Sequence, residues 1–219
     1  MALNQPREVY VVFSKTSTGI GKMICDLTHS YYNHVSLSFD KNLSAMYSFG
    51  RRYVNSPLVG GFIIERPARY LAADSDIYVK VCRIELTEAE YSHIRELILH
   101  FFKHRDDILY NTFGALCSLI GRRGDIKDAY TCIGFVTNAL GISGVLTIPE
   151  LELLMSTDIV YCGNLRGIAK SSRPLGSFFV RQGRWQICWG TAVHFSRLIG
   201  RACGGGLRRM RVFVGRSVL

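Results

Sequence analysis

Strand-forming segments fill most of the first 86 residues of this chain, and this arrangement constrains its fold more than any other feature. Within residues 34–40, Val35, Leu37 and Phe39 alternate with polar residues, the period of a half-buried strand. Short apolar or alternating runs predict further strands at 8–14, 45–50, 60–65 and 76–86. The turn between residues 40 and 45 predicts that the segments on either side of it form a hairpin.

Helical patterns follow these strands. Thr87 and Glu90 make a capping box, and apolar residues from Tyr91 to Phe102 keep helical spacing behind it. We expect further helices at 109–120, 131–142 and 148–156, and a closing strand at 158–163. The chain is therefore expected to form one α+β domain in which an antiparallel sheet packs against helices.

The charge of the chain is divided unevenly between two regions. The formal net charge is +10, yet residues 1–169 hold 17 Lys and Arg against 17 Asp and Glu. We expect a domain at 1–169 that does not bind nucleic acid, followed by a basic tail at 170–219. Two interpretations of the tail stay open: a basic amphipathic helix that contacts anionic membrane, or a disordered, non-native extension.

Composition favours a reducing compartment. The N-terminal residues lack a long apolar run behind a basic cap, and no stretch approaches the ~18 apolar residues of a spanning helix. The 7 cysteines are scattered without paired short spacing, which argues against a zinc site and a disulfide framework. We therefore expect a cytoplasmic protein that uses no metal or organic cofactor.

Cys132 is the strongest candidate for a nucleophile. It lies at the first turn of the helix predicted from residue 131, where Thr131 or Asp128 is positioned to cap. Unpaired N–H groups and the positive end of the helix dipole favour a thiolate at this position. The backbone N–H of Cys132 is also a candidate oxyanion donor.

His34 is the candidate base. It begins the alternating strand at 34–40, and none of the other five histidines begins a predicted strand. If this strand packs against the start of the helix at residue 132, the two side chains form a Cys–His pair.

The segment Cys132-Ile133-Gly134-Phe135-Val136 resembles the Cys-x-Gly-Phe-Val signature of NlpC-type, papain-like cysteine peptidases. Here the histidine strand precedes the cysteine, an order that resembles the circularly permuted branch with the YiiX-like amidases and the lecithin:retinol acyltransferase-like enzymes. The similarity covers about residues 8 to 163. It implies a permuted papain-like fold.

The resemblance also implies a third polar residue that orients the imidazole. In the permuted branch this residue usually comes from the next strand, which makes Ser48 the first choice and Tyr47 the second. Glu65 takes the role if its strand lies alongside. Tyr130, Tyr47 and Glu65 are candidates for contacting the substrate.

The expected function is that of a thiol hydrolase, an amidase or peptidase that acts through an acyl-cysteine on a small-molecule, peptide or acyl substrate. Two alternatives stay open. One is a lipid-type acyltransferase of the same fold, which the basic tail would suit. The other is a binding or membrane-associated module with weak catalysis, because Ser48 and Tyr47 are poor orienters of a histidine.

Overall fold

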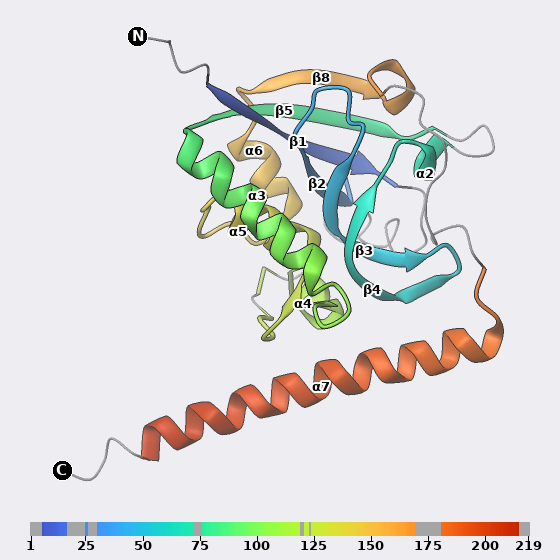
Figure 1. The fold of residues 1–219 in the computed structure, drawn as a ribbon, viewed down its shortest axis with the longest axis vertical. Helices are drawn as coiled ribbons and strands as arrows, with labels where there is room; N and C mark the ends of the chain where they lie inside the picture. The colour runs from blue at the N-terminus through green and yellow to red at the C-terminus, as the bar shows by residue number, and fades with distance from the viewer. Residues whose placement is uncertain are drawn as a thin grey trace.

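The computed structural model describes residues 6–16, 25, 30–71, 76–118, 121–122, 124–169 and 181–214, without the side chains of residues 57 and 205–214. Its centre is one eight-stranded sheet with the order β7-β6-β4-β3-β2-β1-β5-β8 (Figure 1). The strands are β1 (Arg7–Lys15), β2 (His34–Ser38), β3 (Met46–Tyr53), β4 (Ser56–Glu65), β5 (Tyr78–Leu86), β6 (Leu109–Tyr110), β7 (Ala129–Tyr130) and β8 (Ile159–Asn164).

Helices connect and cover these strands. They are α2 (Ala68–Leu71), α3 (Glu88–Lys103), α4 (Thr112–Ser118), α5 (Cys132–Ala139), α6 (Ile148–Leu154), the 3-10 turn η2 (Leu165–Gly167) and α7 (Arg184–Val214). The predicted capping box is present at the start of α3, where the Thr87 side chain accepts from the backbone N–H of Glu90. The α+β class is therefore confirmed.

The sheet is mixed, in contrast to the antiparallel sheet expected from the sequence. Neighbouring strands pair in antiparallel fashion except β6 and β7, which are parallel. The prediction of a helix from residue 109 was wrong at its start, because Leu109 and Tyr110 form strand β6 and pair with β7. The helix begins at Thr112, where the Asn111 side chain accepts from the N–H of Gly114.

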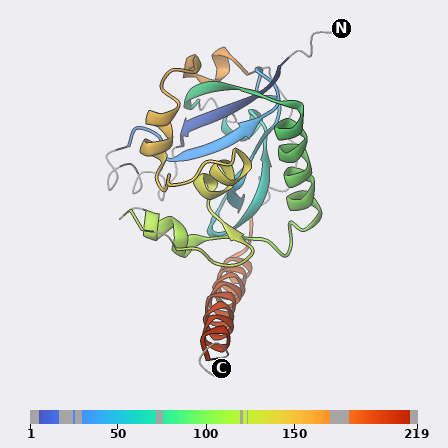
Figure 2. The ribbon, with the colours of Figure 1, turned by 90° about the vertical axis from the view of Figure 1, so that its left-hand side faces the viewer.

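The core lies mainly on one face of the sheet. Phe13, Val35 and Phe49 from the strands pack there against Phe101 of α3 and Phe135 of α5. Figure 2 shows α3, α5 and α6 arranged over this face. A smaller cluster around Val12, Val79 and Leu165 fills the other face. The larger cluster holds the N-terminus of α5 against the strand that begins with His34.

The basic tail contains the long helix α7, which contacts the β4 and β6 side of the domain (Figure 1). Leu198 of α7 is fully buried with Leu109 and Ala129. The buried ring of His194 contacts the Tyr110 carbonyl through Nε2 at 3.1 Å, and Arg201 donates to the Asp128 carbonyl at 2.7 Å. The described part of the tail is thus a helix that contacts the domain.

Arginines separate the apolar residues of α7 into short runs. Across the described part of the chain, no helix combines the length and the apolar character that crossing a bilayer requires.

We predict that Leu198→Ala loosens the docking of α7. Removal of a fully buried leucine costs about 2–5 kcal/mol in lost contacts and residual cavity. Trypsin should then cleave after Arg197 and Arg201 faster than in the wild type. The matched control is Ile199→Ala, because Ile199 is 52 % exposed on the same helix. Equal cleavage of the two variants would contradict the docking described here.

Candidate active site

The first turn of α5 presents Cys132 to the sheet. Thr131 caps the helix, and its Oγ1 accepts from the N–H of Gly134 at 2.9 Å. This bond satisfies the third N–H of the helix and leaves those of Cys132 and Ile133, which begin the helix and have no earlier turn to donate to. The Cys132 side chain is largely buried yet lines a small pocket. A thiol and two first-turn N–H groups therefore share one helix end.

His34 is positioned by the start of β2, where it pairs with Ser14 of β1. The preceding residue, Asn33, fastens this point. Its Oδ1 accepts from the N–H and the hydroxyl of Thr16, and its Nδ2 donates to the Thr16 carbonyl at 2.9 Å. The sequence analysis did not single out Asn33, although an asparagine next to the candidate base was the available signal. It also lines the pocket of Cys132.

The imidazole of His34 interacts with both Cys132 and Glu65. Nε2 of His34 lies 3.0 Å from Oε2 of Glu65. The Cys132 side chain is close enough to the ring to raise the pKa of His34. Since Glu65 occupies Nε2, Nδ1 is the ring nitrogen left for the thiol. The three side chains form a Cys–His–Glu chain in which the carboxylate fixes the orientation of the ring.

Glu65 reaches His34 although β3 lies between their strands in the sheet. Gly50 of β3 borders the ring: a Cβ atom at this position would lie 3.7 Å from Cε1 of His34 and 2.8 Å from Cδ1 of Ile63. A Cβ atom here would therefore force the Ile63 side chain to shift and would touch the His34 ring at ordinary van der Waals distance.

Two residues of α2 hold the other carboxylate oxygen of Glu65. The Tyr70 hydroxyl donates to Oε1 at 2.5 Å, and Nε of Arg69 lies 3.7 Å from the same oxygen. The side chain of Glu65 is 2 % exposed, so an unpaired charge there would be strongly destabilising. The short helix after β4 thus surrounds the buried carboxylate with a donor and a positive charge.

These contacts shift the pKa values of both His34 and Glu65. Burial by itself lowers the pKa of His34, but the charge of Glu65 and the interactions with Cys132 outweigh it and raise this pKa to about 10. Burial raises the pKa of Glu65, but His34, Arg69 and Tyr70 outweigh it and lower this pKa to about 2. At neutral pH the pair is an imidazolium and a carboxylate.

Ser48 does not have the position expected of the third residue. Its fully buried hydroxyl donates to the backbone carbonyl of Val35 at 2.7 Å. The second choice, Tyr47, packs against Phe39 and Phe62. The sequence could not distinguish these strand residues from Glu65, because the contact depends on how α2 and β4 lie against the ring. Of these three residues, Glu65 is the one that contacts the His34 ring, and its contact with substrate stays a prediction.

The pocket at Cys132 has a volume of about 30 Å³ and is bordered by Asn33, Tyr110, Thr131 and Pro149 among others. Such a volume holds one water molecule or one small polar group. Burial raises the pKa of Tyr110, and the nearby Cys132 raises it further. The wall facing the thiol is therefore a neutral phenol.

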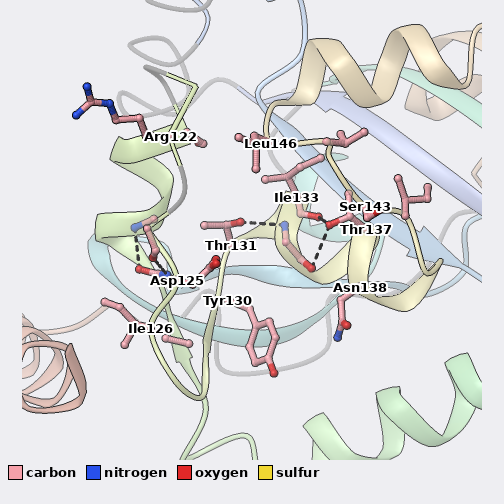
Figure 3. Close-up of a pocket in the computed structure, with 18 of the residues that line it drawn as sticks. Arg122, Asp125, Ile126, Tyr130, Thr131, Ile133, Thr137, Asn138, Ser143 and Leu146 are labelled. Carbon is pink, nitrogen blue, oxygen red and sulfur yellow. Dashed lines mark hydrogen bonds between the residues drawn. The ribbon is translucent and has the colours of Figure 1, made fainter. Parts of the chain in front are cut away.

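A larger pocket of about 530 Å³ adjoins the small one and shares Ser118, Thr131 and Ile133 with it. Figure 3 shows its lining, with Thr131 and Ile133 at the start of α5 and Arg122 and Asp125 on the loop before β7. Tyr130 also lines this pocket, while its ring packs against Phe49 at a tilt and against Phe101 edge-on. The two pockets therefore share lining residues next to Cys132.

The residues that the structure describes do not provide a metal site. In those ranges no three His, Cys, Asp or Glu side chains are grouped so that they could hold a metal ion.

Comparison with known proteins did not identify a family: no family model, no curated protein and no solved structure matches this chain. The resemblance to the permuted papain-like peptidases therefore stays a prediction.

We predict that the His34–Glu65 pair makes stability depend on pH. The pKa of Glu65 is lowered from 4.5 to about 2, so its stabilisation is present above pH 4.5 and is lost as pH falls through 2. The pKa of His34 is raised from 6.5 to about 10, so its stabilisation is present below pH 6.5 and is lost as pH rises through 10.

The measurement is the free energy of unfolding of the wild type and of Glu65→Gln across this range. The wild type should exceed the variant most between pH 4.5 and pH 6.5, with the difference shrinking on either side. A difference that stays constant from the acid to the alkaline end would show that the pair is not ionised as described.

Proposed function

We propose that this protein is a thiol hydrolase in which Cys132 attacks an amide, ester or thioester carbonyl. The observation that carries the proposal is the chain of contacts from Cys132 through His34 to Glu65. A cysteine at a helix start, a histidine beside it and a carboxylate that orients the histidine are the parts that nucleophilic acyl transfer needs.

In the proposed reaction the Cys132 proton resides on His34, which the raised pKa of the imidazole favours. The thiolate sulfur bonds to the carbonyl carbon, and the oxygen takes the electron pair of the carbonyl double bond. The first-turn N–H groups of Cys132 and Ile133 are the proposed donors to the oxygen on which this charge develops. The carbon–leaving-group bond then breaks as His34 gives its proton to the leaving group, and an acyl-cysteine remains.

Water completes the cycle in the second half. His34 accepts a proton from the water as its oxygen bonds to the acyl carbon, and the thiolate leaves. Glu65 stabilises the imidazolium whenever His34 holds the proton and keeps the ring oriented through both halves, and Asn33 holds the strand end from which the imidazole projects. An acceptor other than water would turn the same acyl-cysteine into an acyltransferase intermediate.

The position of Glu65 also bears on the rival interpretation, a binding module with weak chemistry. That interpretation rested on the poor orienting ability of Ser48 and Tyr47. A buried carboxylate at 3.0 Å from the ring supplies the missing orienter and favours the enzyme.

We predict that an activated ester, such as p-nitrophenyl acetate, forms an acyl adduct on Cys132. Peptide mass spectrometry locates the adduct, and release of p-nitrophenol gives its rate. His34→Ala should slow acylation on the order of 100-fold, because the proton acceptor is lost. The exposed Cys188 and Cys203 serve as internal controls for ordinary thiol reactivity. Cys132 acylation at the same rate in both proteins would refute the proposal.

A second comparison tests which residue orients His34. Glu65→Gln should lower the acylation rate of Cys132 at least tenfold, since a neutral amide no longer stabilises the imidazolium. Ser48→Ala should leave the rate near that of the wild type, because its hydroxyl bonds to the Val35 carbonyl. The reverse order of the two variants would return the orienting role to Ser48.

A further inference from the structure

The outward face of α7 carries large apolar side chains that nothing in the described part of the chain covers. Trp185 is 84 % exposed and Trp189 70 % exposed. Ile199 is exposed by 52 % further along the helix. Isolated exposed apolar residues are common, but two neighbouring exposed tryptophans mark an interaction surface.

These residues form one stripe. Trp185, Trp189, Ala192, Ser196 and Ile199 follow one another at spacings of three or four residues, which places them along one side of a helix. The buried His194 and Leu198 belong to the opposite side, which contacts the domain. Figure 1 shows the domain on one side of α7 and no other element on the opposite side. Trp185, Trp189, Ala192 and Ile199 make up the tryptophan face of α7.

The charge around the tryptophan face has one sign. No Asp or Glu follows Asp158, and residues 181–214 contain seven arginines. Arg197 and Arg201 are turned to the domain, where they donate to the carbonyls of Asp106 and Asp128. Arg181 and Arg184 are exposed at the tryptophan end of the helix. An apolar stripe beside exposed arginines complements a surface that is apolar beneath a negatively charged layer.

We infer that the tryptophan face docks the protein on an anionic lipid bilayer, with α7 lying in the plane of the interface. Tryptophan suits this position because its ring is apolar and its N–H is polar. The arginines add attraction to anionic headgroups. The inner side of α7 remains on the domain through Leu198 and His194, so docking requires no rearrangement of the fold. This inference is independent of the chemistry at Cys132.

The chain offers a direct probe of this face, because both of its tryptophans lie on it. Intrinsic tryptophan fluorescence of the full chain is recorded during titration with vesicles of phosphatidylcholine or of equal parts phosphatidylcholine and phosphatidylglycerol. Anionic vesicles should shift the emission to the blue and protect it from acrylamide. Raising the salt to about 1 M should weaken this binding, since its electrostatic part is screened.

Vesicle flotation compares the variants. Trp185→Ala/Trp189→Ala should lower the apparent affinity for anionic vesicles at least tenfold. The matched control is Leu153→Ala/Leu154→Ala, which removes two exposed leucines from α6 and should bind as the wild type does. An unchanged trypsin pattern at Arg197 and Arg201 verifies that α7 stays docked in each variant.

Three results would overturn the inference. The first is emission that anionic vesicles leave unchanged. The second is equal binding of the tryptophan and leucine variants. The third is a blue shift that grows with protein concentration in the absence of lipid, together with a doubled mass in sedimentation, because a second copy of the chain would then cover the tryptophan face.

Discussion

The buried contact between His34 and Glu65 is the interaction on which the candidate site depends. A carboxylate with 2 % exposure cannot stay ionised unless positive charge and donors surround it. His34, Arg69 and Tyr70 meet that requirement from β2 and α2. The same contacts hold the ring with Nε2 engaged by Glu65, which leaves Nδ1 for the proposed interaction with Cys132. The stability of the fold and the proposed chemistry therefore both depend on a charge pair that forms only in the folded chain.

The sheet explains how residues so distant in sequence meet. Antiparallel pairing carries His34, Gly50 and Glu65 on three successive strands, and Gly50 lies beside the His34 ring. The helix that begins at Cys132 packs through Phe135 and Val136 in the same core cluster as Val35 of β2, which brings its N-terminus to the end of the strand where His34 starts. The His34–Glu65 charge pair, the Cys132 thiol and the first-turn N–H groups of α5 come together where these elements meet.

The basic tail joins this arrangement at its edge. β6 and β7 contribute only two residues each, and α7 covers that region with Leu198, His194 and Arg201. His194 contacts the carbonyl of Tyr110, whose side chain borders the pocket of Cys132. A helix rich in arginine thus uses its inner arginines on backbone carbonyls, and turns its tryptophans outward. The unequal charge of the two regions reflects this division between a domain of zero net charge and a positively charged surface helix.

The sequence by itself determined the strands from β1 to β5, the capped helix α3 and the placement of Cys132 at a helix start, because these follow from local periodicity and capping. It also singled out His34. The partner of His34 was decided by tertiary structure. No local pattern shows that the Glu65 side chain reaches His34 past β3, or that the Ser48 hydroxyl donates to the Val35 carbonyl. The strand at 109–110 and the docking of α7 were decided in the same way. Two residues are too few for a period, and a charged helix meets its partner only when distant segments have already formed a surface.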